Sequence, residues 1–180
     1  MQRECYRFGG VTFAIEADAP IERSAMCVPF HAADSAPEHT IRLHFDDRLP
    51  VPPETAQHRG AVWRWQSGAE RHLLEQYGTP DKPPRFTYAV TRGAHTEVTF
   101  ANAYRAGASV RAVLEAAGLF DIFAARGMLV LHSAYIVTSA GEAILFSGPS
   151  GVGKSTQAAL WERCTGARVV NGDRALVDVG

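Results

Sequence analysis

The chain has 180 residues, of which 46% are apolar and 21% charged, the usual balance of a globular protein with one large domain or two small ones. Its net charge of −1 gives no electrostatic case for nucleic acid or an acidic membrane as a partner. No apolar run reaches the ~18 residues that span a bilayer, and the N-terminus has no signal-like apolar stretch. The three widely spaced cysteines fit reduced thiols, so we expect a cytoplasmic protein.

Short strands separated by turn signals are predicted for the first 105 residues. Apolar and polar residues alternate in several of them, which is the pattern of a strand with one buried face. The candidate strands are residues 5–8, 11–16, 40–45, 61–66, 85–91 and 97–101. We therefore predict a small, mostly antiparallel β domain over residues 1–105.

Five aromatic side chains in this region leave two interpretations open. Either they line a peptide-binding face, or they pack the core of the β domain, as strand aromatics more often do. The five are Trp63, Trp65, Tyr77, Phe86 and Tyr88.

The sequence pattern changes near residue 108. Apolar residues recur mostly at spacings of three and four over residues 109–126, which predicts one helix that ends at Gly127. Apolar runs at 128–137 and 143–146 predict two strands, and the turn-like residues 138–141 between them suggest a hairpin. In that hairpin the numbers of paired residues would sum to 279 or 280.

A phosphate-binding pattern, G-x-x-x-x-G-K-[ST], is complete at residues 148–155. Its glycines allow positive φ angles, and its N–H groups can form an anion nest at the start of a helix. Lys154 is expected to reach the β- and γ-phosphates, and Ser155 to ligate Mg²⁺. The candidate nucleotide-binding residues are Gly148, Pro149, Ser150, Gly151, Val152, Gly153, Lys154, Ser155 and Thr156.

Asp173 is a further candidate because of where the next strand should end. A helix after Lys154, a turn and a strand from Ala167 form a crossover that returns the chain parallel to the strand before the loop. Ligands bind at the carboxyl ends of such strands, which makes Asp173 a candidate magnesium ligand or general base. Asn171-Gly172-Asp173 is also good turn chemistry, and a plain turn residue is the alternative.

His132 is a candidate because the predicted hairpin places it opposite Ser147 or Gly148. A histidine at that position could donate a hydrogen bond to the γ-phosphate or organise the nucleophile. A core histidine satisfied by the backbone is the alternative.

These segments together resemble a known catalytic core. Leu131-His132-Ser133-Ala134, the loop from Gly148 to Thr156, and Asn171-Gly172-Asp173 are similar to HPr kinase/phosphorylase and to ATP-dependent phosphoenolpyruvate carboxykinase, which shares that core. The resemblance covers about residues 110–180, and the separation of 19 residues from Lys154 to Asp173 fits it. The whole chain looks most like the HPr kinase-related proteins of bacterial peptide-modification gene clusters.

The resemblance implies an α/β fold: the β-rich domain of residues 1–105, followed by a P-loop kinase-like core over residues 106–180. It implies ATP and Mg²⁺ as cofactors and a serine hydroxyl of a protein or peptide as phosphoacceptor. Lys154 and Ser155 would hold the phosphates and the metal, and His132 would contact the γ-phosphate or help to deprotonate the acceptor. Asp173 would act as base or hold the metal.

The chain departs from the family pattern in two ways. The family's acidic pair is Gly172-Asp173 or Asp173-Arg174 here, so one carboxylate is missing. Arg174 would instead place positive charge near the phosphates or simply form a surface ion pair. Only 24 residues follow Thr156, which predicts a core truncated at its C-terminus, either as a fragment or with a layer supplied by a partner. An apolar sheet edge left exposed in this way would favour homo-oligomers.

Two functions therefore stay open. The first is an HPr kinase-like phosphotransferase, and the alternative is a nucleotide-binding module without catalysis. A carboxykinase reaction is disfavoured, because no site for a substrate carboxylate and its metal is evident.

Overall fold

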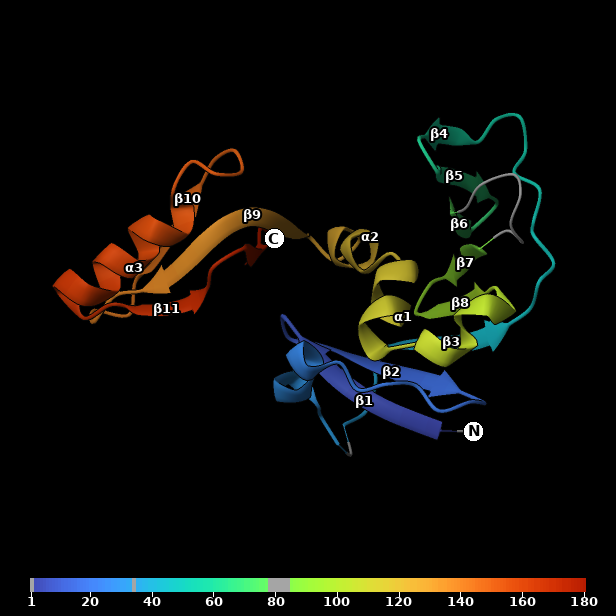
Figure 1. The fold of residues 1–180 in the computed structure, drawn as a ribbon, viewed down its shortest axis with the longest axis horizontal. Helices are drawn as coiled ribbons and strands as arrows, with labels where there is room; N and C mark the ends of the chain where they lie inside the picture. The colour runs from blue at the N-terminus through green and yellow to red at the C-terminus, as the bar shows by residue number, and fades with distance from the viewer. Residues whose placement is uncertain (1, 34, 78–84) are drawn as a thin grey trace. The chain divides into compact units, whose positions relative to one another are not determined.

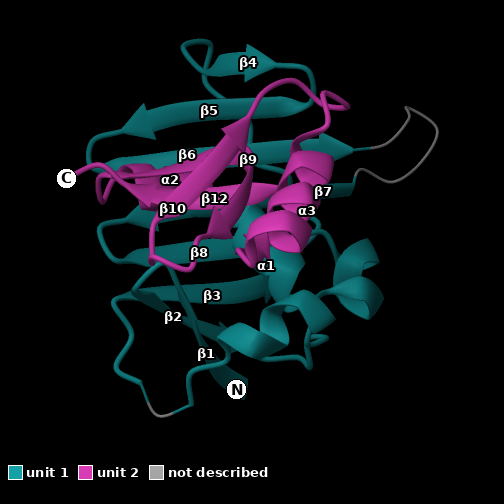
Figure 2. Ribbon diagram, turned by 90° about the vertical axis from the view of Figure 1, so that its left-hand side faces the viewer, with its two compact units in different colours: residues 1–119 teal, residues 120–180 magenta. Residues whose placement is uncertain are grey.

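The computed structural model describes residues 2–33, 35–77 and 85–180, and it divides into two compact units, residues 1–119 and 120–180 (Figures 1 and 2). The first unit is an eight-stranded sheet in the order β1-β2-β3-β8-β7-β6-β5-β4. Its strands are β1 (Gln2–Phe8), β2 (Val11–Ala17), β3 (His39–Phe45), β4 (Gln57–Arg59), β5 (Val62–Ser67), β6 (Glu70–Tyr77), β7 (Arg85–Arg92) and β8 (His95–Phe100). The sheet is mixed, because β3 runs parallel to both β2 and β8 while the other neighbours are antiparallel.

All six strands predicted for this region are present, but β4 and β6 were missed. The sequence of β6, Glu-Arg-His-Leu-Leu-Glu-Gln-Tyr, has two adjacent leucines and no clean alternation. Two 3₁₀ helices interrupt the strand order: η1 (Ala25–Phe30) lies between β2 and β3, and η2 (Asn102–Gly107) lies between β8 and the first α-helix. The core of the unit contains fully buried residues from neighbouring strands: Phe13, Ile15, Ile41, Leu43, Val98 and Phe100.

Most of the aromatic residues singled out above belong to a second core cluster. Phe86 is fully buried with Leu74 and Ala101, and Trp63, Trp65 and Tyr88 pack against this cluster. These four aromatics therefore pack a core, as the second interpretation expected. Tyr77 is exposed, and its hydroxyl donates to the carboxylate of Glu75.

The single helix predicted over residues 109–126 is two helices, α1 (Val110–Ala116) and α2 (Leu119–Ala124). The break falls at Gly118, whose φ of 70° is left-handed and whose N–H bonds the carbonyl of Glu115. A glycine in this conformation ends a helix, whatever the apolar periodicity on either side of it. Gly127, with φ of 74°, ends the helical segment as predicted.

The second unit is organised around one long strand, β9 (Met128–Val137), visible as the curved arrow in Figure 1. β10 (Ala143–Ser147) pairs with residues 133–137 on one edge of β9, and β11 (Arg168–Asn171) pairs with residues 135–137 on the other edge. β12 (Arg174–Asp178) pairs with residues 128–132 of β9, and all three pairings are antiparallel. The predicted hairpin is confirmed, because β10 and β9 pair with residue numbers that sum to 280. Since β10 and β11 both oppose β9, they run parallel to each other, as the crossover predicted.

One helix, α3 (Lys154–Thr165), covers one face of this small sheet. Its core consists of Ala134, Ile136, Ala158 and Ala167, with Phe146 and Trp161 packed against it. The aromatic rings of Phe146 and Trp161 lie 6.2 Å apart.

The predicted α/β fold class is wrong. Strands make up 46% of the structure and helices 22%, the largest element is the mixed eight-stranded sheet, and an α/β P-loop kinase core is not shown. The physical reason is the position of β9. It lies between β10 and β11 and opposes both, so the sheet has the antiparallel pairing that a doubly wound α/β sheet avoids, and a single helix covers it.

None of the helices within the described ranges is long and apolar enough to cross a membrane. The three cysteines are free thiols; Cys5 and Cys27 are buried and Cys164 is exposed.

We expect Ile136→Ala to destabilise the second unit by about 2–5 kcal/mol, because it removes a fully buried side chain between β9 and α3. Leu129→Ala, on the same strand but 48% exposed, should cost about 1 kcal/mol or less. Urea unfolding followed by Trp161 fluorescence, with Trp63 and Trp65 replaced by Phe, measures this unit. Equal losses in the two variants would contradict the assigned core.

Candidate functional site

The phosphate-binding pattern forms a tight loop between β10 and α3. β10 ends at Ser147 and α3 begins at Lys154, with Gly153 as its N-cap. Gly151 and Gly153 have φ angles of 80° and 96°, which L side chains rarely adopt. A Cβ on Gly148 would lie 3.1 Å from Cγ1 of Val152, a tight contact that would require the exposed valine side chain to shift.

Lys154 folds back over the start of this loop. Its side chain is largely buried, and Nζ donates hydrogen bonds of 3.0 Å to the carbonyls of Gly148 and Pro149. Two of the three ammonium donors are thereby satisfied within the loop. The arrangement fixes a positive charge against the loop, beside the N-terminus of a twelve-residue helix.

Ser155 connects the loop to the turn between β11 and β12. Its hydroxyl donates a hydrogen bond of 3.1 Å to the carbonyl of Gly172. That turn is held by Asn171, whose Oδ1 accepts from the backbone N–H groups of Asp173 and Arg174 at 2.9 and 3.0 Å. The first turn of α3 and the segment that carries Asp173 are therefore joined directly.

Asp173 lies between two basic side chains. Its Oδ1 is 3.3 Å from Nε2 of His132, and its Oδ2 is 3.4 Å from Nε of Arg174. The side chains of His132 and Asp173 are 53% and 69% exposed, so the pairing adds little to stability. Such exposed groups can exchange partners readily.

The structure brings together the residues that the sequence singled out. His132 contacts Asp173, and Gly172, the residue before Asp173, accepts the hydrogen bond of Ser155. Gly148 follows Ser147, which is the last residue of β10 to pair with β9. Ser147 pairs with Ser133, the neighbour of His132. All of these residues belong to the second unit.

Sequence reasoning missed two parts of this site and left a third undecided. It placed Phe120 on the buried face of a helix, but Phe120 is 49% exposed and its ring lies 5.2 Å below the guanidinium of Arg174. It treated Asn171 only as a turn former, although the Asn-Gly-Asp pattern is a recognisable signal for side-chain capping of the following N–H groups. It also left the role of Arg174 open.

The donors present fit a magnesium ion of the kind that is bound mainly by substrate phosphates. No group of three or more His, Cys, Asp or Glu side chains among the described residues could hold a metal alone. Magnesium needs only one or two protein oxygens beside phosphates and water. Because the Ser155 hydroxyl donates its hydrogen to the carbonyl of Gly172, its oxygen lone pairs stay available. The Asp173 carboxylate belongs to the residue that follows Gly172.

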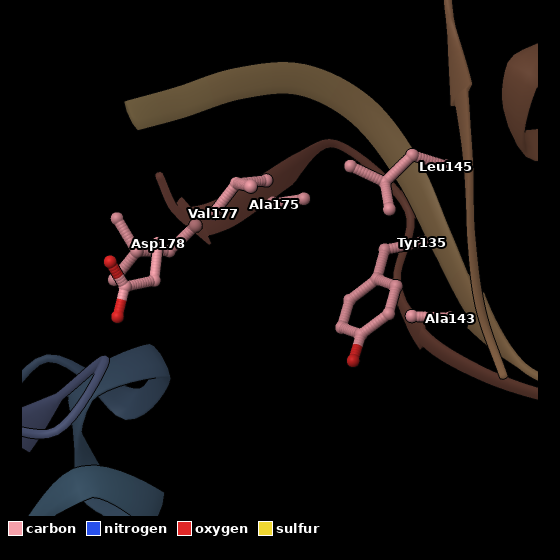
Figure 3. A pocket seen from close by; sticks show the side chains of 7 residues that line it. Tyr135, Ala143, Leu145, Ala175, Val177 and Asp178 are labelled. Carbon is pink, nitrogen blue, oxygen red and sulfur yellow. The ribbon is translucent and has the colours of Figure 1, made fainter. Parts of the chain in front are cut away.

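The second unit also contains a hollow away from this loop. It has a volume of about 240 Å³ and is lined by β9, β10 and β12 (Figure 3). The lining residues are Tyr135, Ala143, Leu145, Ala175, Leu176, Val177 and Asp178. Its single charged group is a carboxylate, Asp178, which would repel phosphate, so it is not the phosphate site.

We expect Gly153→Ala to destabilise the second unit by about 1–2 kcal/mol, because its left-handed backbone would then carry a Cβ. Gly172→Ala is the matched control: its Cβ would meet only Ser155 Oγ at 3.8 Å, and the change should stay within about 0.5 kcal/mol. The Trp161 unfolding assay separates the two. If Gly153→Ala proved as mild as the control, the loop conformation described above would be wrong.

No protein-family model, curated protein or solved structure matches the chain. Its function is therefore inferred from its own residues.

Proposed function

We propose that this protein binds ATP with Mg²⁺ through residues 148–155 and transfers the γ-phosphate to a hydroxyl group, a serine of a protein or peptide. The observation that carries the proposal is the hydrogen bond from Ser155 to the Gly172 carbonyl. It brings a phosphate-binding loop next to a turn whose carboxylate, Asp173, is in contact with His132. A loop for phosphate binding alone would not need these two groups beside it.

Phosphate binding is supported by the donors at the start of α3. The left-handed glycines turn the loop, and successive N–H groups in such a conformation attract anions. The helix N-terminus adds partial positive charge, and Lys154 adds a full one. When phosphates bind, the ammonium would exchange a carbonyl partner, Gly148 or Pro149, for a phosphate oxygen at little cost, because each hydrogen bond replaces another.

Ser155 would hold magnesium, and Asp173 would be either a second ligand of the ion or the general base. The ion would neutralise charge on the phosphates during transfer. Ser155 already points its hydroxyl hydrogen at the Gly172 carbonyl, so its oxygen needs no reorientation to act as a ligand.

As base, Asp173 would accept the proton of the acceptor hydroxyl. In the transfer, the hydroxyl oxygen bonds to the γ-phosphorus, the bond from that phosphorus to the β–γ bridging oxygen breaks, and ADP leaves. The hydroxyl proton goes to a carboxylate oxygen of Asp173, and His132 stabilises the carboxylate from its other side. This is the arrangement that the resemblance to HPr kinase/phosphorylase also implies.

A second function is favoured by one observation, the glycine at position 172. A Cβ there would face the Ser155 hydroxyl at 3.8 Å, yet the residue supplies only a backbone carbonyl where a second carboxylate could stand. With one carboxylate the site would hold nucleotide and metal without transferring phosphate. The protein would then be a nucleotide-binding module.

We expect Lys154→Met to weaken MgATP binding at least tenfold, because hydrogen bonds from a charged group are worth about 1.5–3 kcal/mol. Calorimetry with wild-type protein, Lys154→Met and Arg163→Gln measures it. Arg163, in the last turn of the same helix, controls for loss of one positive charge. Equal affinity in wild type and Lys154→Met would refute phosphate binding at this loop.

We expect wild-type protein with MgATP to phosphorylate members of a serine-containing peptide library, and Asp173→Asn to lose at least about 100-fold of that activity, as removal of a general base does. Mass spectrometry of the peptides gives the readout, and calorimetry checks that Asp173→Asn still binds ATP. Equal phosphorylation by both proteins would remove Asp173 from the mechanism. Nucleotide binding without any phosphopeptide would favour the binding-module function.

A further inference from the structure

Arg174 is a basic side chain at this site to which the proposed function gives no role. Its Nε lies 3.4 Å from Asp173, and its guanidinium lies over the ring of Phe120, 5.2 Å from the centroid. Its backbone N–H bonds Asn171, which fixes the start of β12. The arginine is therefore held in position without being buried.

The strand register places Arg174 on the same side of the sheet as the loop. Arg174 pairs directly with His132, so the two side chains leave the sheet on one face. Side chains alternate along β9, and Ala134 and Ile136, which pack against α3, share that face with His132. The start of β12 thus presents a cation on the face that carries α3 and its N-terminal loop.

Arg174 is also within reach of bound phosphates. It lies two residues beyond Gly172, whose carbonyl accepts the Ser155 hydroxyl. Two residues of chain span at most about 7 Å, a distance that the long arginine side chain can cover. The present pair is a single Nε–Oδ2 contact of 3.4 Å, whereas a terminal phosphate carries more charge and can accept two parallel N–H bonds from the guanidinium.

We propose that Arg174 leaves Asp173 and binds the terminal phosphate of a nucleoside triphosphate held by residues 148–155, so that the site distinguishes triphosphate from diphosphate. This inference rests on the proposed nucleotide binding. The exposed Arg174–Asp173 pair contributes little energy, so the exchange is easy. It frees Oδ2 of Asp173 for an acceptor hydroxyl only once the triphosphate is in place, while Oδ1 stays with His132.

The test is calorimetry of MgATP and MgADP binding to wild type, Arg174→Gln, Arg174→Lys and the surface control Arg163→Gln. We expect Arg174→Gln to weaken MgATP binding about tenfold, the effect of losing a charge-assisted hydrogen bond, and to leave MgADP binding within about twofold. Arg174→Lys keeps the charge but loses the planar guanidinium group, so its MgATP affinity should fall between those of wild type and Arg174→Gln. Arg163→Gln should bind both nucleotides as wild type does.

Each other result overturns the inference. If wild type binds nucleotide but Arg174→Gln leaves both affinities unchanged, or lowers both equally, Arg174 does not contact the terminal phosphate, and the proposed function survives. If wild type binds neither nucleotide, the proposed function fails and this inference fails with it. Unfolding midpoints of the variants, which should match wild type, show that the comparison concerns binding and not folding.

Discussion

The site depends on a single strand, β9, because that strand fixes the position of every group around the loop. β10, which leads into residues 148–155, pairs with β9 over residues 133–137. β12, which follows Asp173, pairs with it over residues 128–132. The register of a strand pair is strongly specified where one face of the strand is buried. Ala134 and Ile136 form such a buried face on β9. The loop, His132 and Asp173 are therefore placed by the same set of backbone hydrogen bonds.

The groups placed in this way differ in how firmly they are held. Lys154 is largely buried and bonded within the loop, and Ser155 is tied to Gly172. Asp173 and Arg174 stand on an exposed turn that only Asn171 and weak ion pairs organise. A firmly held loop beside a looser turn suits the proposed phosphoryl transfer, because catalysis there would rest on positioning and charge neutralisation, while the second substrate must enter and leave.

Local sequence patterns predicted the parts of this site that depend on local physics. Three features could be predicted, because each rests on backbone conformation or on alternation: the glycine spacing at 148–155, the apolar hairpin of β9 and β10, and the end of the helical segment at Gly127. The fold class could not be predicted in this way. The insertion of β9 between β10 and β11 is a choice of long-range pairing, which no local pattern records. Gly118 and Phe120 show the same limit of local patterns. The apolar periodicity predicted one continuous helix across both residues, but the left-handed conformation of Gly118 splits the helix, and the ring of Phe120 is exposed.

The central claim is that residues 148–155 bind the phosphates of a nucleotide, and backbone amide NMR spectra with and without MgATP test it most directly. The account predicts that the amide signals of Gly151, Gly153, Lys154 and Ser155 shift on titration, together with that of Asp173, while signals from the eight-stranded sheet stay in place. Unchanged loop amides at saturating MgATP, or shifts confined to the hollow lined by Tyr135 and Asp178, would contradict it.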